Sequence, residues 1–153
     1  MKYEVLLKEA ESNGIYIIEN AEFKSGADGL INGNMIGINK NVRTYKKRTC
    51  ILAEELGHYY TTVGNILSQS NIDCQKQEQK ARLWAYNKLI GLNGVVKAFQ
   101  NGCQSLHDTA DYLDVTEKFL KDTLQTYCNK YGTHVKYGNY VITFMPTLNI
   151  ELN

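Results

Sequence analysis

The stretch AEELGHYY at residues 53–60 decides how this chain is interpreted. Glu54 and His58 are four residues apart, so on a helix their side chains project from one face, about one turn from each other. A single helix can present two ligands to one metal ion in this way. Glu55 stands beside the first of them, where a carboxylate can act as general base on a metal-bound water. The stretch therefore predicts a candidate metal site.

A catalytic zinc ion usually has three protein ligands and keeps a fourth position for water, so a further ligand is needed. Glu78, on the next predicted helix, is the candidate. Ala81 is on the same face and is small enough to let the two helices approach closely. Arg82, four residues after Glu78, can hold its carboxylate. The proposed ligands are therefore Glu54, His58 and Glu78.

The rest of the chain predicts an α+β fold. The expected elements are a helix over 2–12, a strand over 15–19, hairpin arms at 29–31 and 35–38, the motif helix from Thr49, a helix capped by Asp73 and ending before Gly91, helices over 95–99, 105–112 and 116–127, and a strand over 140–144. Strands followed by helices indicate a single α+β domain. Residues 1–92 hold the hairpin and the ligand helices. Residues 93–153 are helical, with a helix-turn-helix-like segment and a short β tail.

The composition of the chain argues against several classes of protein. The 153-residue chain has a formal net charge of +1, which gives no electrostatic argument for nucleic acid or an anionic membrane. No stretch approaches the roughly 20 apolar residues that span a bilayer. The four cysteines form no C-x-x-C pair, and the N-terminal stretch reads as an amphipathic helix and not as an export signal, so they are expected to be reduced. We expect a cytoplasmic protein.

Two segments together resemble a known family. They are the run TCILAEELGHYY at 49–60 and the later pattern QE-x-x-AR-x-WA-x-x-KLI at 77–90. Together with the segment over 106–116, they are similar to the ImmA/IrrE family of metallopeptidases, and most of all to its small members from prophages and other mobile elements. The first run corresponds to a gluzincin-type H-E-x-x-H motif with Glu54 in place of the first His.

The resemblance implies a zincin-like fold and a zinc-dependent endopeptidase. His58 corresponds to the second His of the motif, Glu55 to the general base and Glu78 to the third ligand. It also implies a protein substrate, namely a helix-turn-helix transcriptional repressor, so that the protein would act as an anti-repressor. A ligand set of two Glu and one His is harder than two His and one Glu, so Mn²⁺ or Fe²⁺ could enter in place of Zn²⁺. Either the hydrolase is active with this ligand set, or the fold has lost its metal or its turnover.

Hydrolysis also needs a donor for the tetrahedral oxyanion and a way to align the substrate. Tyr59, Tyr60 and His134 are candidate donors, although Tyr59 and Tyr60 also suit a packing role and His134 is expected in a turn. The segment Met35, Ile36, Gly37 and Ile38 could align a peptide by strand addition.

Two other functions stay open. The segment from Ser105 to Tyr127 has a helix-turn-helix pattern that could bind DNA. However, the helix that would contact the bases mixes acids and bases, and the acids of the first helix would repel phosphate. We therefore expect no direct nucleic-acid contact there. The remaining alternative is an inactive metallopeptidase-like protein that binds its repressor partner without cutting it.

Overall fold

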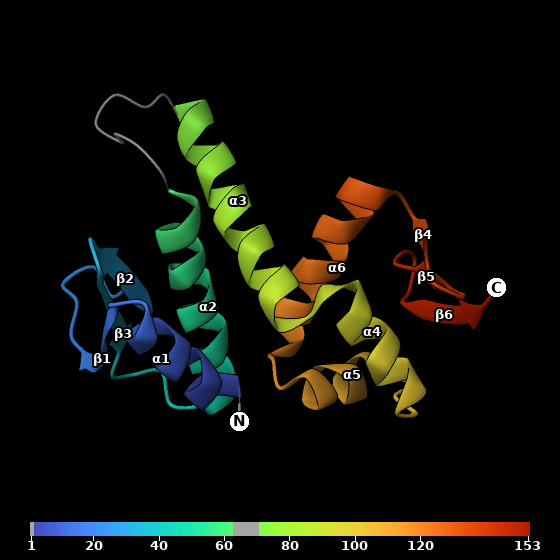
Figure 1. The fold of residues 1–153 in the computed structure, drawn as a ribbon, viewed down its shortest axis with the longest axis horizontal. Helices are drawn as coiled ribbons and strands as arrows, with labels where there is room; N and C mark the ends of the chain where they lie inside the picture. Colours follow the sequence, from blue (N-terminus) through green and yellow to red (C-terminus); the bar gives the residue numbers. More distant parts are fainter. Residues whose placement is uncertain (1, 63–70) are drawn as a thin grey trace. The chain divides into compact units, whose positions relative to one another are not determined.

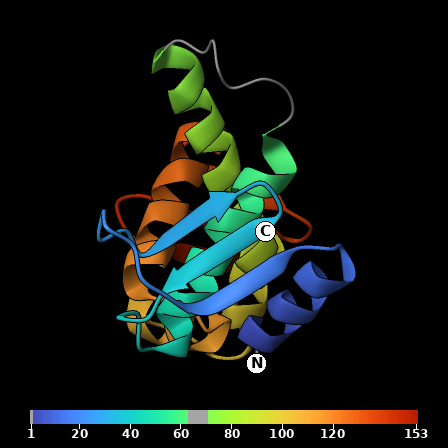
Figure 2. The same cartoon turned by 90° about the vertical axis from the view of Figure 1, so that its left-hand side faces the viewer.

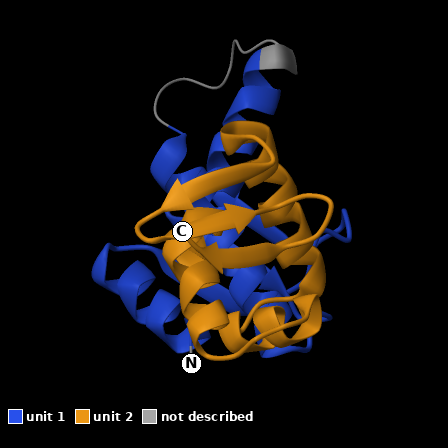
Figure 3. Cartoon of the chain, turned by 90° about the vertical axis from the view of Figure 1, so that its right-hand side faces the viewer, with its two compact units in different colours: residues 1–85 blue, residues 86–153 orange. Residues whose placement is uncertain are grey.

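The computed structural model describes residues 2–62 and 71–153 and is mixed α+β, as the sequence predicts. The chain divides into two compact units, residues 1–85 and 86–153 (Figure 3). The division falls inside a helix and not at the 92/93 boundary expected between the two parts of one domain. Each unit has its own three-stranded sheet.

The first unit carries the N-terminal elements and the two helices with the predicted ligands (Figure 1). They are α1 (Lys2–Ser12), β1 (Tyr16–Ala21), β2 (Gly29–Asn32), β3 (Met35–Asn39), α2 (Tyr45–Thr61) and α3 (Asn71–Leu89), which continues across the division. The predicted first helix, first strand and hairpin are confirmed. Asp73 lies in the first turn of α3, so its expected role as the cap is wrong.

The sheet of the first unit has the order β1-β3-β2, with β3 in the centre (Figure 2). β2 and β3 form the predicted antiparallel hairpin, whose turn contains Gly33 at φ +61°. β1 pairs in parallel with the other side of β3, with Tyr16 opposite Met35. Ile36 and Ile38 of β3 are fully buried on the face that turns toward α2.

α2 begins earlier than expected. Thr44 caps it, accepting a hydrogen bond from the Lys47 backbone N–H at 3.2 Å, so the helix starts at Tyr45 and not near Thr49. Arg48 then donates to the backbone carbonyls of Val42 at 2.8 Å and Glu19 at 2.9 Å. Arg48 thereby ties the first turn of α2 to the strand β1 and to the loop after β3.

The second unit has three helices and a meander of three strands. These are α4 (Gly91–Gln100), α5 (Leu106–Leu113), α6 (Glu117–Tyr131), β4 (His134–Tyr137), β5 (Tyr140–Thr143) and β6 (Asn149–Leu152). The predicted helices and the strand of the tail are confirmed. The expectation that His134 lies in a turn is wrong, because it begins β4.

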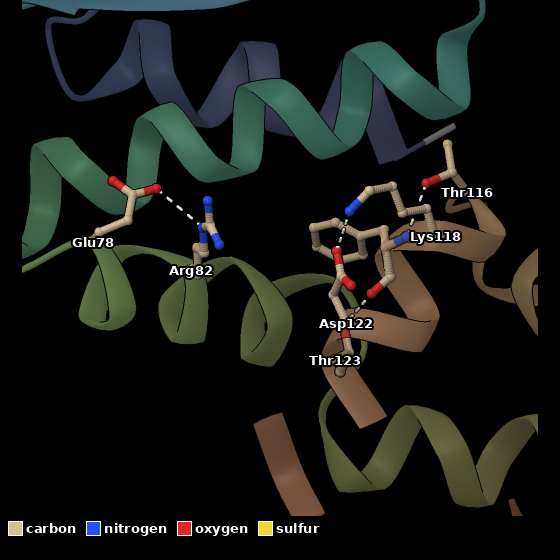
Figure 4. A network of polar contacts seen from close by, with 7 residues as sticks. Glu78, Arg82, Thr116, Lys118, Asp122 and Thr123 are labelled. Carbon is tan, nitrogen blue, oxygen red and sulfur yellow. Dashed lines mark hydrogen bonds and ion pairs between the residues drawn. The ribbon is translucent and has the colours of Figure 1, made fainter. Parts of the chain in front are cut away.

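α5 and α6 have the helix-turn-helix connection that the sequence indicates. Asp114, in the left-handed region at φ 58°, ends α5, and the Thr116 side chain caps α6 by accepting from Phe119 N–H at 3.1 Å. Lys118 of α6 pairs with Asp122 one turn later, at 2.7 Å (Figure 4). This pairing neutralises part of the cationic charge that a DNA-contacting helix would need.

Two further expectations concern the whole chain. The structure holds no disulfide between the four cysteines, of which Cys50 is buried and Cys74 is exposed. None of the described helices has the length and apolar character that crossing a bilayer requires.

Candidate metal centre

α2 places the three motif side chains on one stretch of regular helix. Leu52, Ala53 and Leu56 are buried in the first unit, which leaves Glu54, Glu55 and His58 half-buried beside them. The one-turn spacing of Glu54 and His58 that the sequence predicts is therefore present in the helix.

Gly57 is the point at which α2 and α3 touch. A Cβ atom added to Gly57 would lie 2.2 Å from the Ala81 carbonyl oxygen, closer than any side chain can approach a backbone atom. Ala81 is itself fully buried. The two backbones are in contact here, which confirms the close approach predicted from Ala81.

This contact brings His58 and Glu78 together across the two helices. His58 Nε2 lies 3.0 Å from Glu78 Oε2. The other oxygen, Oε1, accepts from Arg82 Nε, also at 3.0 Å (Figure 4). The predicted contact of Arg82 with the Glu78 carboxylate is confirmed. His58 and Glu78, which the sequence predicts as ligands of one metal ion, lie next to each other.

The Glu55 carboxyl has an environment unlike that of an ordinary surface acid. It is packed under β2, where a Cβ at Gly29 would lie 3.2 Å from Glu55 Oε1. Burial first, and then the negative charges of Glu54 and Glu78, raise the pKa of Glu55 to about 7. A carboxylate with a pKa near neutrality is suited to take up and return a proton at physiological pH.

The arrangement can be tested for its fit to a metal ion. Two donor atoms on a tetrahedral zinc ion, each about 2.0–2.1 Å from it, are about 3.3 Å apart. The 3.0 Å separation of His58 Nε2 and Glu78 Oε2 is close to that value. These two donors fit a shared ion after a shift of a few tenths of an ångström.

Glu54, the third predicted ligand, does not join His58 and Glu78 in a group that could bind a metal ion. Within residues 2–62 and 71–153, no group of three or more His, Cys, Asp and Glu side chains is gathered closely enough to hold a metal. The structure thus brings His58 and Glu78 together. Glu55 lies close enough for the negative charge of Glu78 to raise its pKa.

The candidate oxyanion donors separate into different roles. The Tyr60 hydroxyl accepts from Asn13 Nδ2 at 2.9 Å, and its ring packs against Trp84 with centroids 5.1 Å apart, so Tyr60 joins α2 to α3 and to the turn after α1. Tyr59 packs edge-on against Tyr60, with ring centroids 5.2 Å apart. His134 belongs to the second unit, where its Nδ1 lies 3.3 Å from Thr133 Oγ1.

The prediction that Met35–Ile38 align a peptide substrate by strand addition is wrong. Met35–Ile38 belong to β3, which is paired on both sides, so no peptide can be added to it. Among the strands that the structure describes, the one beside Glu55 that lies at the edge of the sheet is β2, and the side of β2 away from β3 is called its free side here. The sequence could not distinguish the two hairpin arms, because the pairing that makes β3 central comes from β1, which is distant along the chain.

The pairing of β2 with β3 determines which backbone N–H and C=O groups of β2 point toward β3 and which point to the free side. Asn39 N–H donates to Asp28 C=O at 2.8 Å, and these residues are directly opposite in the register. In an antiparallel ladder, bonded and non-bonded pairs alternate. Leu30 therefore bonds toward β3, whereas the N–H and C=O groups of Gly29 and Ile31 point to the free side.

Comparison with known proteins gives no relative from which function could be transferred. No protein-family model matches the chain, and no curated protein or solved structure matches it significantly.

Proposed function

We propose that this protein is a metal-dependent endopeptidase that cleaves a specific partner protein, a helix-turn-helix repressor of the mobile element that encodes it. The observation that carries the proposal is the position of Glu55. It is a carboxyl with a pKa of about 7, next to a His–Glu pair formed by two helices in backbone contact. The resemblance to the ImmA/IrrE family gives the substrate class.

His58 and Glu78 would hold the metal, with Glu54 as the third ligand after a change of its side-chain rotamer. Zn²⁺, or Mn²⁺ or Fe²⁺ in its place, would lower the pKa of a bound water and polarise the scissile carbonyl. Arg82 keeps the Glu78 carboxylate oriented, since it binds the oxygen that does not face His58.

Glu55 moves the proton. As the water attacks the peptide carbonyl, the Glu55 carboxylate takes one proton from the water. Glu55 then gives this proton to the amine that leaves when the C–N bond breaks. Glu55 is suited to both transfers by its position beneath β2, beside the His58–Glu78 pair. Tyr59 is the neighbouring phenol that could donate to the oxyanion.

The free side of β2 would align the substrate. An extended peptide can bond to the outward N–H and C=O groups of Gly29 and Ile31, next to Glu55. The missing side chain of Gly29 leaves room for this carboxyl beneath the strand.

The first test is the zinc content of the purified protein and of three variants. We expect about one equivalent of zinc in the wild type, loss of it in His58→Ala and Glu78→Ala, and retention in Glu4→Gln, which changes an exposed acid of α1. Wild-type protein that stays free of metal after dialysis against zinc, with its fold intact, rules out the metallopeptidase.

The second test is cleavage of the repressor. Glu55→Gln should bind the repressor and leave it whole, whereas wild type and Glu4→Gln should produce the same two fragments. Cleavage by Glu55→Gln at the wild-type rate contradicts the assigned role of this carboxyl.

A second candidate function is binding of the repressor without cleavage. The outer face of the first sheet favours it, because Tyr16 and Ile18 of β1, Leu30 of β2 and Met35 of β3 are all at least 45% exposed and lie on that one face. A contiguous apolar face of this kind is typical of protein–protein contact. Binding alone predicts that repressor capture survives Glu55→Gln and chelation, and that no fragment forms.

A further inference from the structure

A groove of about 930 Å³ lies wholly within the second unit. One wall comes from α4, α5 and α6, and the other from residues 144–150, which are the connection between β5 and β6 and the first two residues of β6. The volume is in the range of small-molecule sites, about 300–1,000 Å³. None of the residues considered for the metal centre lines it.

Both walls are held in place by contacts inside the second unit. Phe144 packs against Tyr127 and Tyr131, with centroids 6.0 and 6.4 Å away. At the other end, the Phe99 ring meets Tyr140 edge-on at 6.1 Å. Gln100 Nε2 also donates to the Tyr140 hydroxyl at 3.0 Å. A groove whose walls are fixed in advance costs little ordering entropy when a ligand binds.

More than half of the surface that lines the groove is apolar. Val95, Leu124, Phe144 and Ile150 line it and are all buried, while Phe99, also in the lining, is 39% exposed. Leu106, Met145 and Leu148 also line the groove and are only half-buried. A ligand that covered these three side chains and Phe99 would remove apolar surface from water, which is favourable in proportion to the area covered. The body of the ligand should therefore be a hydrocarbon chain or ring.

The charged residues that line the groove indicate which charge a ligand should carry. They are Lys121 and Asp122, neighbours on α6. The Asp122 carboxylate is paired with Lys118 at 2.7 Å, one turn earlier (Figure 4). Across the described part of the chain, no carboxylate forms such a pair with Lys121. Among the described residues, Lys121 is thus the charged side chain of the lining that is not held in an ion pair.

We propose that this groove binds a small amphipathic monoanion, namely a carboxylic acid with an aliphatic or aryl body, whose carboxylate pairs with Lys121. The binding is non-covalent and separate from the proposed peptidase site. It requires neither a metal nor turnover, so it can fail or hold independently of the proposed function.

The test compares three probes of equal chain length on the full-length protein: decanoate, decan-1-ol and decylammonium. Amide NMR shifts locate the binding, and their titration gives the affinity. We expect shifts in α4, α6 and residues 144–150, with decanoate binding about fivefold more tightly than decan-1-ol and decylammonium binding most weakly. Equal affinity for decanoate and decan-1-ol overturns the anionic class, and shifts confined to the first unit overturn the site.

Variants separate the charge from the apolar body. Lys121→Ala should remove the advantage of decanoate over decan-1-ol, whereas Lys130→Ala, on the same helix and outside the lining, should leave it unchanged. Leu106→Trp and Leu148→Trp fill the groove from opposite walls, and either one, if folded by its amide spectrum, should abolish binding of both probes. Decanoate affinity that is unaffected by Lys121→Ala contradicts the proposal.

Discussion

Gly57 of α2 lies against the carbonyl oxygen of Ala81 in α3, with no space for even a methyl group between the two helices. The next residue, His58, reaches Glu78 at 3.0 Å, three positions before Ala81 on the facing helix. The backbone contact and the side-chain pair are therefore parts of one arrangement. Anything that separates the helices at Gly57 should also separate His58 from Glu78.

Gly57→Ala should lower the free energy of unfolding by about 1–3 kcal/mol, even though alanine favours helix by about 1 kcal/mol over glycine. The new Cβ would lie 2.2 Å from a backbone oxygen, which cannot turn aside as a side chain could. Thermal and denaturant unfolding, followed by circular dichroism, measure the effect.

Gly94→Ala is the matched control. Its Cβ would meet the end of the Leu113 side chain at 3.2 Å, so a small rotamer adjustment is enough. This helical substitution should be neutral or should stabilise by up to about 1 kcal/mol. If Gly57→Ala proved as stable as Gly94→Ala, the close approach of α2 and α3 would not be required by the fold.

Glu55→Gln should stabilise the metal-free protein at alkaline pH and have little effect at acidic pH. The folded-state pKa is raised from 4.5 to about 7, so the protonated carboxyl is the favoured form. The stability of the wild type is then fully present below pH 4.5 and declines as pH rises through 7. Glutamine cannot ionise and avoids this decline.

The expected gain at pH 8 is about 1–2 kcal/mol, which allows for the partial exposure of Glu55 to solvent. Denaturant unfolding at pH 5 and pH 8, in the presence of a chelator, measures it. Glu4→Gln, on the exposed side of α1, should show no such pH-dependent gain. A gain of equal size at both pH values would place the effect in packing and not in ionisation.

Arg82→Met should weaken zinc binding by about tenfold and leave the fold intact. Arg82 does not face the metal position, but it binds the second oxygen of Glu78 at 3.0 Å and so restricts the rotation of that carboxylate. Loss of an orienting partner typically costs 10- to 100-fold in affinity. Competition with a chromophoric chelator gives the constant. Lys80→Met, an exposed change on the same helix, is the control, and equal affinities in the two variants would refute the orienting role.

The parts of this structure that the sequence predicts are those set by local signals. The Asn32-Gly33 turn specifies its hairpin, and helical spacing alone puts Glu78 and Arg82 within reach of each other. The close approach of α2 and α3 was predicted from the small residues Gly57 and Ala81, and it brings His58 next to Glu78.

What the sequence misses depends on contacts between distant segments. The central place of β3 follows from parallel pairing with β1, which no local pattern records. β4 and β6 are four residues each, too short for alternation to be distinguished from a loop. The side-chain position of Glu54 relative to His58 and Glu78 depends on rotamers, which helical spacing does not determine.

The free side of β2 gives the last prediction. The Ile31 N–H points away from β3, whereas the Leu30 N–H bonds toward it. Proline at either position removes one N–H donor. Ile31→Pro should therefore keep the sheet, apart from about 1–2 kcal/mol of lost side-chain packing, and should slow repressor cleavage by removing a donor to the substrate. Leu30→Pro should instead break a bond within the hairpin and destabilise the first unit.

The two variants are compared by unfolding midpoint and by cleavage rate below that midpoint. If Ile31→Pro cleaves at the wild-type rate while folded, the substrate does not add to this edge, and its alignment beside Glu55 must come from elsewhere in the first unit.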